Sequence, residues 1–201
     1  MKLPMDTNAS LSFTRHPGAE SRRYELRPKN AAPVYVRHGA PDGWSLPQGY
    51  EPRFTLFQDP AGTTPLAVVV RCDGRHLVVL TPDNKPLADL RLPPKNKRWR
   101  PTYEIHLPDG RVLRGREGTV PSLIWSALLA PFLLLYLAAL FFSDSAAGTF
   151  TAPLRTSWRQ QGQSFGRAEL IETARGRFQA RGAGLDHRVA YAQPVAKHWK
   201  P

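Results

Sequence analysis

The stretch LIWSALLAPFLLLYLAALFF, residues 123–142, decides how the rest of this chain is interpreted. It contains no charged residue. At about 1.5 Å per residue, a helix of this length spans roughly 30 Å, the thickness of a bilayer's hydrocarbon core. Leu, Ile and Phe occupy most positions and favour insertion into lipid by several kcal/mol. The stretch therefore predicts one transmembrane helix within residues 121–143.

Two residues within this stretch fit a membrane helix better than a helix in water. Pro131 lies near the middle, and membrane helices tolerate a proline there as a kink. Trp125 lies near one edge, where an indole ring suits the boundary between lipid and water. We therefore predict that Trp125 is a membrane-interface anchor.

A second architecture could also accommodate the stretch. A helix that is apolar all round needs protein or lipid on every side. A β-barrel closed around a hydrophobic helix provides this, as in tubby-like folds. This alternative predicts a lipid-handling barrel in which the β segments before and after the stretch form one domain, whereas a membrane span would separate them.

Composition limits the remaining possibilities. The 201 residues carry a net charge of +12 and include 20 prolines and 15 glycines, which favours short strands and turns over long helices. The strong positive charge suits an anionic membrane surface or nucleic acid. Cys72 is the only cysteine, so the chain cannot form an internal disulfide.

The distribution of basic residues around the stretch predicts an orientation. Residues 91–122 contain eight Lys or Arg residues, and residues 143–174 contain three. Because basic residues close to a span remain on the cytoplasmic side, we expect a single-pass protein of the cytoplasmic membrane with its N-terminus in the cytoplasm.

Residues 51–120 have the pattern of a β-meander, and the first 50 residues look largely irregular. Short apolar runs at 66–70, 77–80, 87–92, 103–107 and 111–114 alternate with turn sequences such as Asp73-Gly74 and Pro108-Asp109-Gly110. Side chains at 68, 70, 78, 80, 103 and 105 are expected to form its apolar face. The N-terminal region, 1–50, contains many turn formers and offers one short strand at 33–36.

The basic C-terminal segment, 144–201, shows three short strand patterns. They lie at 168–173, at 177–180 and around Val189 and Tyr191, where apolar and other residues alternate. Three such strands scarcely form a domain alone. The expected fold class is therefore a membrane-anchored, mainly-β protein, with one transmembrane helix between a β-meander region and a short β-rich C-terminal segment.

The best candidate for a binding site is the basic and aromatic run from Lys95 to Arg100. A tryptophan among cations suits a membrane surface, where the ring lies at headgroup level and the cations meet lipid phosphates. Single-stranded nucleic acid is a less favoured ligand for the same composition, and a solvated loop is the simplest interpretation. The candidate residues for a membrane surface or an anionic ligand are Lys95, Lys97, Arg98, Trp99 and Arg100.

No residue pattern indicates catalysis, a metal site or a cofactor. The six histidines are dispersed, and the pair Asp186-His187 has no recognisable nucleophile motif beside it. We therefore expect a non-enzymatic membrane protein that presents a small basic β-rich domain. Its expected partners are the lipid bilayer, with possible anionic headgroups and a possible protein partner.

Overall fold

The computed structural model describes most of the chain apart from several loops and the hydrophobic stretch. The described residues are 6–12, 24–28, 31–46, 48–94, 101–118, 128, 131, 155–163, 167–173, 177–181 and 184–198.

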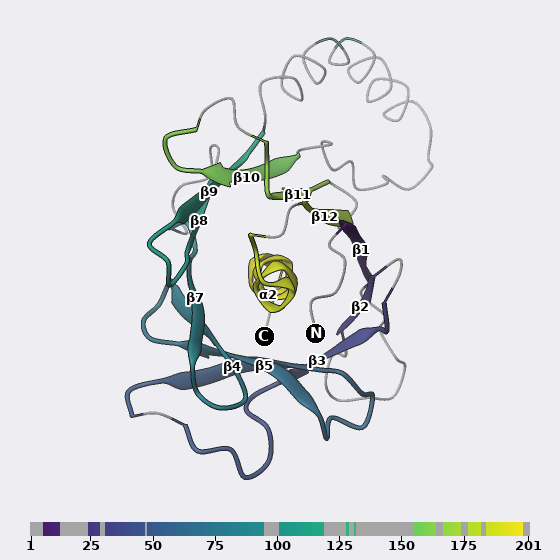
Figure 1. The fold of residues 1–201 in the computed structure, drawn as a ribbon, viewed down its shortest axis with the longest axis vertical. Helices are drawn as coiled ribbons and strands as arrows, with labels where there is room; N and C mark the ends of the chain where they lie inside the picture. The colour runs from purple at the N-terminus through teal and green to yellow at the C-terminus, as the bar shows by residue number, and fades with distance from the viewer. Residues whose placement is uncertain are drawn as a thin grey trace, which may run out of the picture.

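Twelve antiparallel strands form a closed barrel in the described part of the chain (Figure 1). The strands are β1 (Asp6–Ser12), β2 (Tyr24–Pro28), β3 (Val34–His38), β4 (Glu51–Phe57), β5 (Pro65–Arg71), β6 (His76–Leu80), β7 (Pro86–Arg91), β8 (Thr102–His106), β9 (Val112–Glu117), β10 (Thr156–Gln160), β11 (Leu170–Glu172) and β12 (Arg177–Arg181). Each strand pairs with the next along the chain, and β12 closes the barrel against β1, with Ala9 opposite Phe178. Because the barrel is closed, its strands leave no unpaired edge.

The barrel unites regions that the sequence pattern separated. Strands β10 to β12 come from the C-terminal segment and fill the gap between β9 and β1. The expected division into a β-meander at 51–120 and a separate segment at 144–201 is therefore wrong. The expectation of an irregular region at 1–50 also needs correction, because that region supplies β1, β2 and β3.

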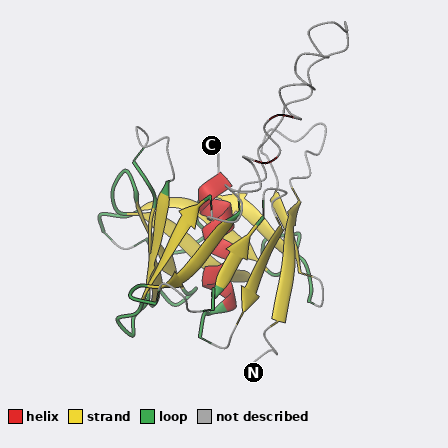
Figure 2. Cartoon of the chain, turned by 90° about the horizontal axis from the view of Figure 1, so that it is seen from above, coloured by secondary structure: helices red, strands yellow, loops and turns green. Residues whose placement is uncertain are grey.

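Helix α2 (His187–His198) runs along the inside of the barrel (Figures 1 and 2). Residues 189–196 are all buried. The alternation around Val189 and Tyr191 predicted a strand, and that prediction is wrong. A helix enclosed by strands on every side buries its whole circumference, so no single apolar stripe marks it as a helix.

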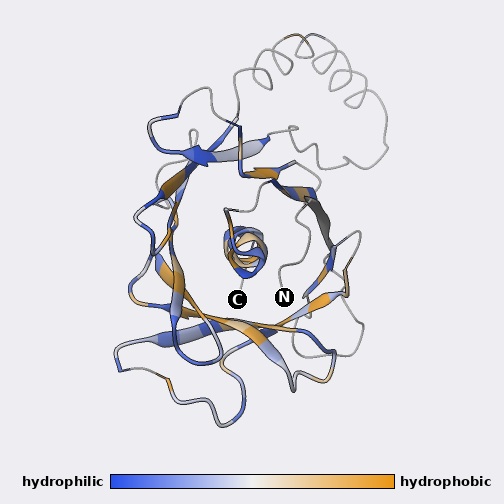
Figure 3. Cartoon of the chain, in the orientation of Figure 1, coloured by the Kyte–Doolittle hydropathy of each residue, from blue (hydrophilic) through white to orange (hydrophobic). Residues whose placement is uncertain are grey.

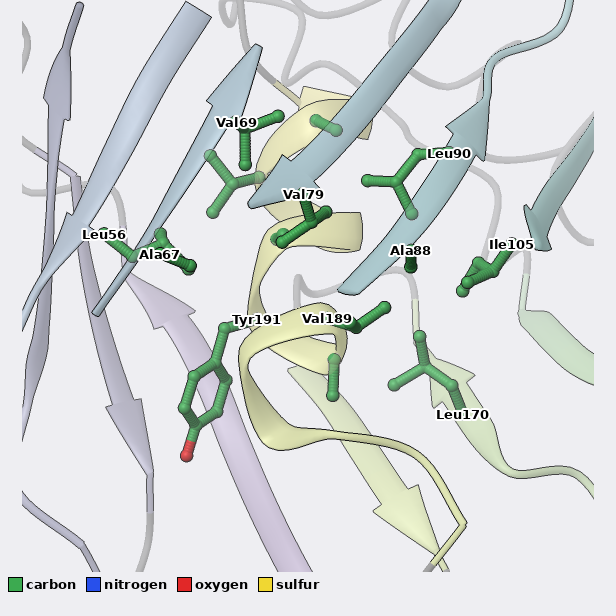
Figure 4. Close-up of a cluster of buried hydrophobic side chains, with 14 of the residues drawn as sticks. Leu56, Ala67, Val69, Val79, Ala88, Leu90, Ile105, Leu170, Val189 and Tyr191 are labelled. Carbon is green, nitrogen blue, oxygen red and sulfur yellow. The ribbon is translucent and has the colours of Figure 1, made fainter. Parts of the chain in front are cut away.

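The core lies between this helix and the inward-facing side chains of the strands. Five fully buried side chains surround Val189 and Tyr191 of α2 (Figure 4). They are Leu56, Val69, Val79, Leu90 and Ile105. Hydrophobic and hydrophilic residues alternate along many of the strands (Figure 3), as expected when one face of a strand is dry and the other is wet.

A second apolar cluster lies on the outside of β5 and β6. Val68, Val70, Val78 and Leu80 are buried there beneath Trp44 and Tyr50. Trp44 fixes this cover by donating its indole N–H to the carbonyl of Pro82 at 2.9 Å. The predicted apolar face thus combined two surfaces: Tyr103 and Ile105 belong to the interior core, whereas the four aliphatic residues face outward under a loop.

Within the described ranges, no helix is long and apolar enough to cross a membrane. The predicted span at 121–143, with Trp125, lies outside those ranges except for Leu128 and Pro131, both exposed helical positions. The ends of the connection that contains it are close together, because the Gly118 N–H donates to the Arg155 carbonyl at 3.2 Å. One barrel cannot have neighbouring strands on opposite sides of a bilayer, so the predicted single-pass arrangement is incompatible with the pairing of β9 and β10.

Candidate functional site

One end of the barrel, which we call the exit end, is where the chain leaves β9 and returns in β10. Paired strand residues mark it, including His76 with Arg91 and Thr156 with both Glu117 and Glu172. The same end receives the C-terminus of α2, because Lys197 donates a hydrogen bond to the Thr156 hydroxyl at 3.0 Å. The connection that contains the hydrophobic stretch therefore starts and ends at this end of the barrel.

The basic and aromatic run predicted as a binding site also belongs to a connection at the exit end. Lys95, Lys97, Arg98, Trp99 and Arg100 themselves lie outside the described residues. Their segment joins β7 to β8, and its last neighbour, Pro101, accepts a hydrogen bond from the Glu117 N–H at 3.3 Å. The two features singled out in the sequence, the hydrophobic stretch and the basic run, are thus connections at one end of the barrel.

Exposed arginines are concentrated at the exit end. None of these arginines forms an ion pair with another residue that the structure describes. Three exposed acids lie at the same end: Asp42, Glu51 and Asp73. The five arginines are Arg75, Arg91, Arg116, Arg155 and Arg177. Sequence reasoning missed this grouping, because these arginines are spread over a hundred residues and only the barrel brings them to one end.

The opposite end of the barrel contains two ion-paired groups, together with the exposed cations Lys85 and Arg167. Arg111 donates its Nε to Asp109 at 2.7 Å and lies 3.5 Å from Glu169. Asp186 accepts hydrogen bonds from Arg188, both from the guanidinium at 2.7 Å and from the backbone N–H at 2.8 Å. Among the described residues, the exit end thus has more exposed cations outside ion pairs than the opposite end has.

Asp186 has a structural role at the start of α2. Its carboxylate caps the first turn, where unpaired N–H groups need an acceptor. Burial raises the pKa of Asp186, but its bonds to Arg188 outweigh this and hold the pKa below its ordinary value. His187 lies 3.6 Å from Asp186, and burial lowers the pKa of its imidazole. The Tyr191 ring packs edge-on against the His187 imidazole, with 5.9 Å between the ring centres.

A buried ionic cluster occupies the barrel interior at the exit end. Glu172, 3 % exposed, accepts bonds from Lys197 at 3.1 Å and from His198. Lys197 also lies 3.8 Å from Glu117 and 5.2 Å from the centre of the Tyr103 ring. Burial alone would raise the pKa of Glu172, but His198 and Lys197 outweigh it, so the pKa is lowered. This cluster fastens α2 to β9, β10 and β11, beside the exit of the hydrophobic stretch.

The geometry defines an antiparallel β-barrel around a C-terminal helix, with a cationic exit end. Comparison of the chain with protein-family models, curated proteins and solved structures finds no match. No group of three or more His, Cys, Asp or Glu side chains among the described residues is arranged to hold a metal ion.

Proposed function

We propose that this protein is a non-enzymatic, membrane-associated barrel whose exit end faces an anionic bilayer. The hydrophobic stretch at 123–142 enters the lipid from one side and returns to the same side, and the exposed arginines meet lipid headgroups. The barrel then holds its ligand or partner at the bilayer surface, where tethering raises the effective concentration. The tubby-like, lipid-handling alternative placed the hydrophobic stretch inside a barrel, whereas the helix enclosed here is α2.

The observation that carries this proposal is the hydrogen bond between Gly118 and Arg155. It brings both ends of the connection to one point on the barrel, so the chain must return to where it left. If the chain crossed the bilayer and then came back as an extended segment, the unpaired backbone groups of that segment would each cost several kcal/mol in lipid. A stretch that dips into one leaflet from a single side avoids this cost, and Pro131 near its centre suits a bend.

Charge supports the same orientation. Lys and Arg near an anionic surface each contribute on the order of 1 kcal/mol to binding. The five exposed arginines of the exit end, together with the four cations of the 95–100 run, provide this attraction around the hydrophobic stretch.

Cysteine labelling in intact cells tests the topology. With Cys72→Ser as background, Ser45→Cys lies before the stretch and Gln161→Cys lies after it, both at exposed positions. We expect an impermeant maleimide to label either both positions or neither position in intact cells, and to label both after lysis. Labelling of only one position in intact cells would refute the same-side topology and restore a single crossing.

Flotation with vesicles tests the membrane association. The full chain should float with vesicles that contain phosphatidylglycerol and resist carbonate extraction. A variant with residues 119–154 replaced by a short Gly-Ser linker should bind the same vesicles weakly and lose binding as salt rises. If the full chain stays unbound, the proposed function is wrong.

A further inference from the structure

The outer surface of the barrel has a hollow at the exit end, beside the turn between β5 and β6. Its volume is about 300 Å³, and it is lined by Asp73, Arg75, His76, Arg91 and Leu92. Three of the five lining residues can carry positive charge. The hollow lies directly before the connection that contains the basic run, because Leu92 is followed by Pro93 and Pro94.

Strand pairing positions the basic side chains of the hollow. His76 and Arg91 lie opposite each other on β6 and β7, and both point outward because Leu77 and Leu90 face the core. Arg75 joins them because its carbonyl accepts the Leu92 N–H at 2.9 Å. Arg91 and His76 thus present a guanidinium and an imidazole side by side, two groups that can donate hydrogen bonds to an anion.

The described carboxylates nearby accept no hydrogen bond from the side chains of Arg75, His76 and Arg91. Asp73 uses one oxygen to accept the N–H groups of Arg75 and His76, each at 2.9 Å. Asp89 lies 3.7 Å from His76 Nε2, too far for a hydrogen bond, and this nitrogen is buried without a hydrogen-bond partner. Glu104, which is opposite Arg91 on β8, instead pairs with Arg114 and His106 at 3.3 Å each.

We infer that this hollow binds a phosphate monoester. Such a group carries nearly two negative charges and three terminal oxygens. Two guanidinium groups outside any ion pair with a described residue, and an imidazole nitrogen without a described hydrogen-bond partner, match those acceptors, since Arg binds phosphate through paired N–H donors. A phosphodiester offers one charge and two such oxygens, so it should bind more weakly. A role for the hollow in binding lipid headgroups rests on the proposed function. Binding of a phosphate monoester as such does not.

Titration of the full chain in nonionic detergent tests the site without vesicles. The probes are dihexanoyl phosphatidate, dihexanoyl phosphatidylglycerol and glycerol 3-phosphate, followed by calorimetry and by the NMR signals of the His76 imidazole. We expect phosphatidate to bind at least tenfold more tightly than phosphatidylglycerol and to shift the His76 signals. Equal binding of glycerol 3-phosphate would assign the site to soluble phosphate monoesters, and preference for phosphatidate would assign it to a lipid.

Matched variants separate the site from general charge attraction. Arg75→Gln/Arg91→Gln should weaken phosphate-monoester binding at least tenfold, whereas Arg116→Gln/Arg177→Gln removes the same charge from the same end and should change it less than threefold. Equal loss in both variants, or no binding of any monoester, would overturn the inference. Vesicle flotation of the full chain reports the proposed function separately, because the hydrophobic stretch is intact in every variant.

Discussion

Glu172 is the residue on which the attachment of the inner helix depends most. Its carboxylate is buried and neutralises Lys197 and His198 at the end of α2. Removing one partner of a buried ion pair leaves the other charge uncompensated, at about 3–5 kcal/mol. We therefore expect Glu172→Gln to lower the free energy of unfolding by about that amount in urea titrations. The exposed Glu51→Gln is the control and should stay within about 0.5 kcal/mol of the wild type.

The same carboxylate predicts how stability depends on pH. Its pKa in the folded barrel is below the ordinary 4.5, and the groups facing it are Lys197, His198 and Glu117. A carboxyl whose pKa falls on folding stabilises the protein above its unfolded pKa, and this stabilisation is lost as the pH falls through the folded pKa. Thermal unfolding should show a Tm that declines below about pH 4.5. The gap between wild type and Glu172→Gln should narrow over the same range; a constant gap would contradict this role.

Gly115 tests how tightly the barrel wall is packed. It lies opposite Trp158 across β9 and β10, and a Cβ atom there would come within 2.4 Å of the Trp158 indole nitrogen. Trp158 is fully buried, so it cannot move aside easily. Gly115→Ala should cost about 1–3 kcal/mol of stability, as overpacked cores do. Gly74→Ala is the matched control, because no atom lies within 4 Å of its added Cβ.

At the scale of elements, the sequence predicted strands well and helices poorly. Runs such as 66–70, 77–80 and 103–107 became β5, β6 and β8, because their turns and β-branched residues act locally. The face assignment failed on β5 and β6, where both sides are apolar and alternation gives no direction. The inner helix was missed because its burial depends on strands that are distant in sequence.

Helix α2 should be required for cooperative folding of the barrel. Its eight consecutive buried residues fill the space that the inward-facing strand residues would otherwise expose to water. A chain ending at Asp186 should lose its near-UV circular dichroism and bind the dye ANS, as loosely packed states do. A peptide of residues 184–201 added in trans should restore the native signal. A sharp, cooperative transition of the truncated chain without the peptide would contradict this requirement.

At the scale of the whole molecule, sequence reasoning singled out two candidate functional segments but did not place them at one end of the barrel. The basic run at 95–100 and the hydrophobic stretch at 123–142 were recognisable from composition. The connections that contain both segments start at the same end because the barrel closes. The same closure groups Arg75, Arg91 and Arg116 at that end. The predicted orientation, with the N-terminus in the cytoplasm, stays a prediction, because the pairing of β9 and β10 does not say on which side of a bilayer the barrel lies.

The closure of the barrel predicts that it folds without the hydrophobic stretch. Glu117 and Thr156 are already paired, so a linker of four residues can replace the 36 residues from 119 to 154 without moving either strand. Shortening the connection ninefold should reduce the entropic cost of closing the loop and raise the free energy of unfolding by about 2 kcal/mol. Urea unfolding of the linker variant, followed by far- and near-UV circular dichroism, measures this. A variant that fails to fold cooperatively would show that the barrel needs the stretch itself, because the paired ends of β9 and β10 would then not suffice to hold β10 to β12 in place.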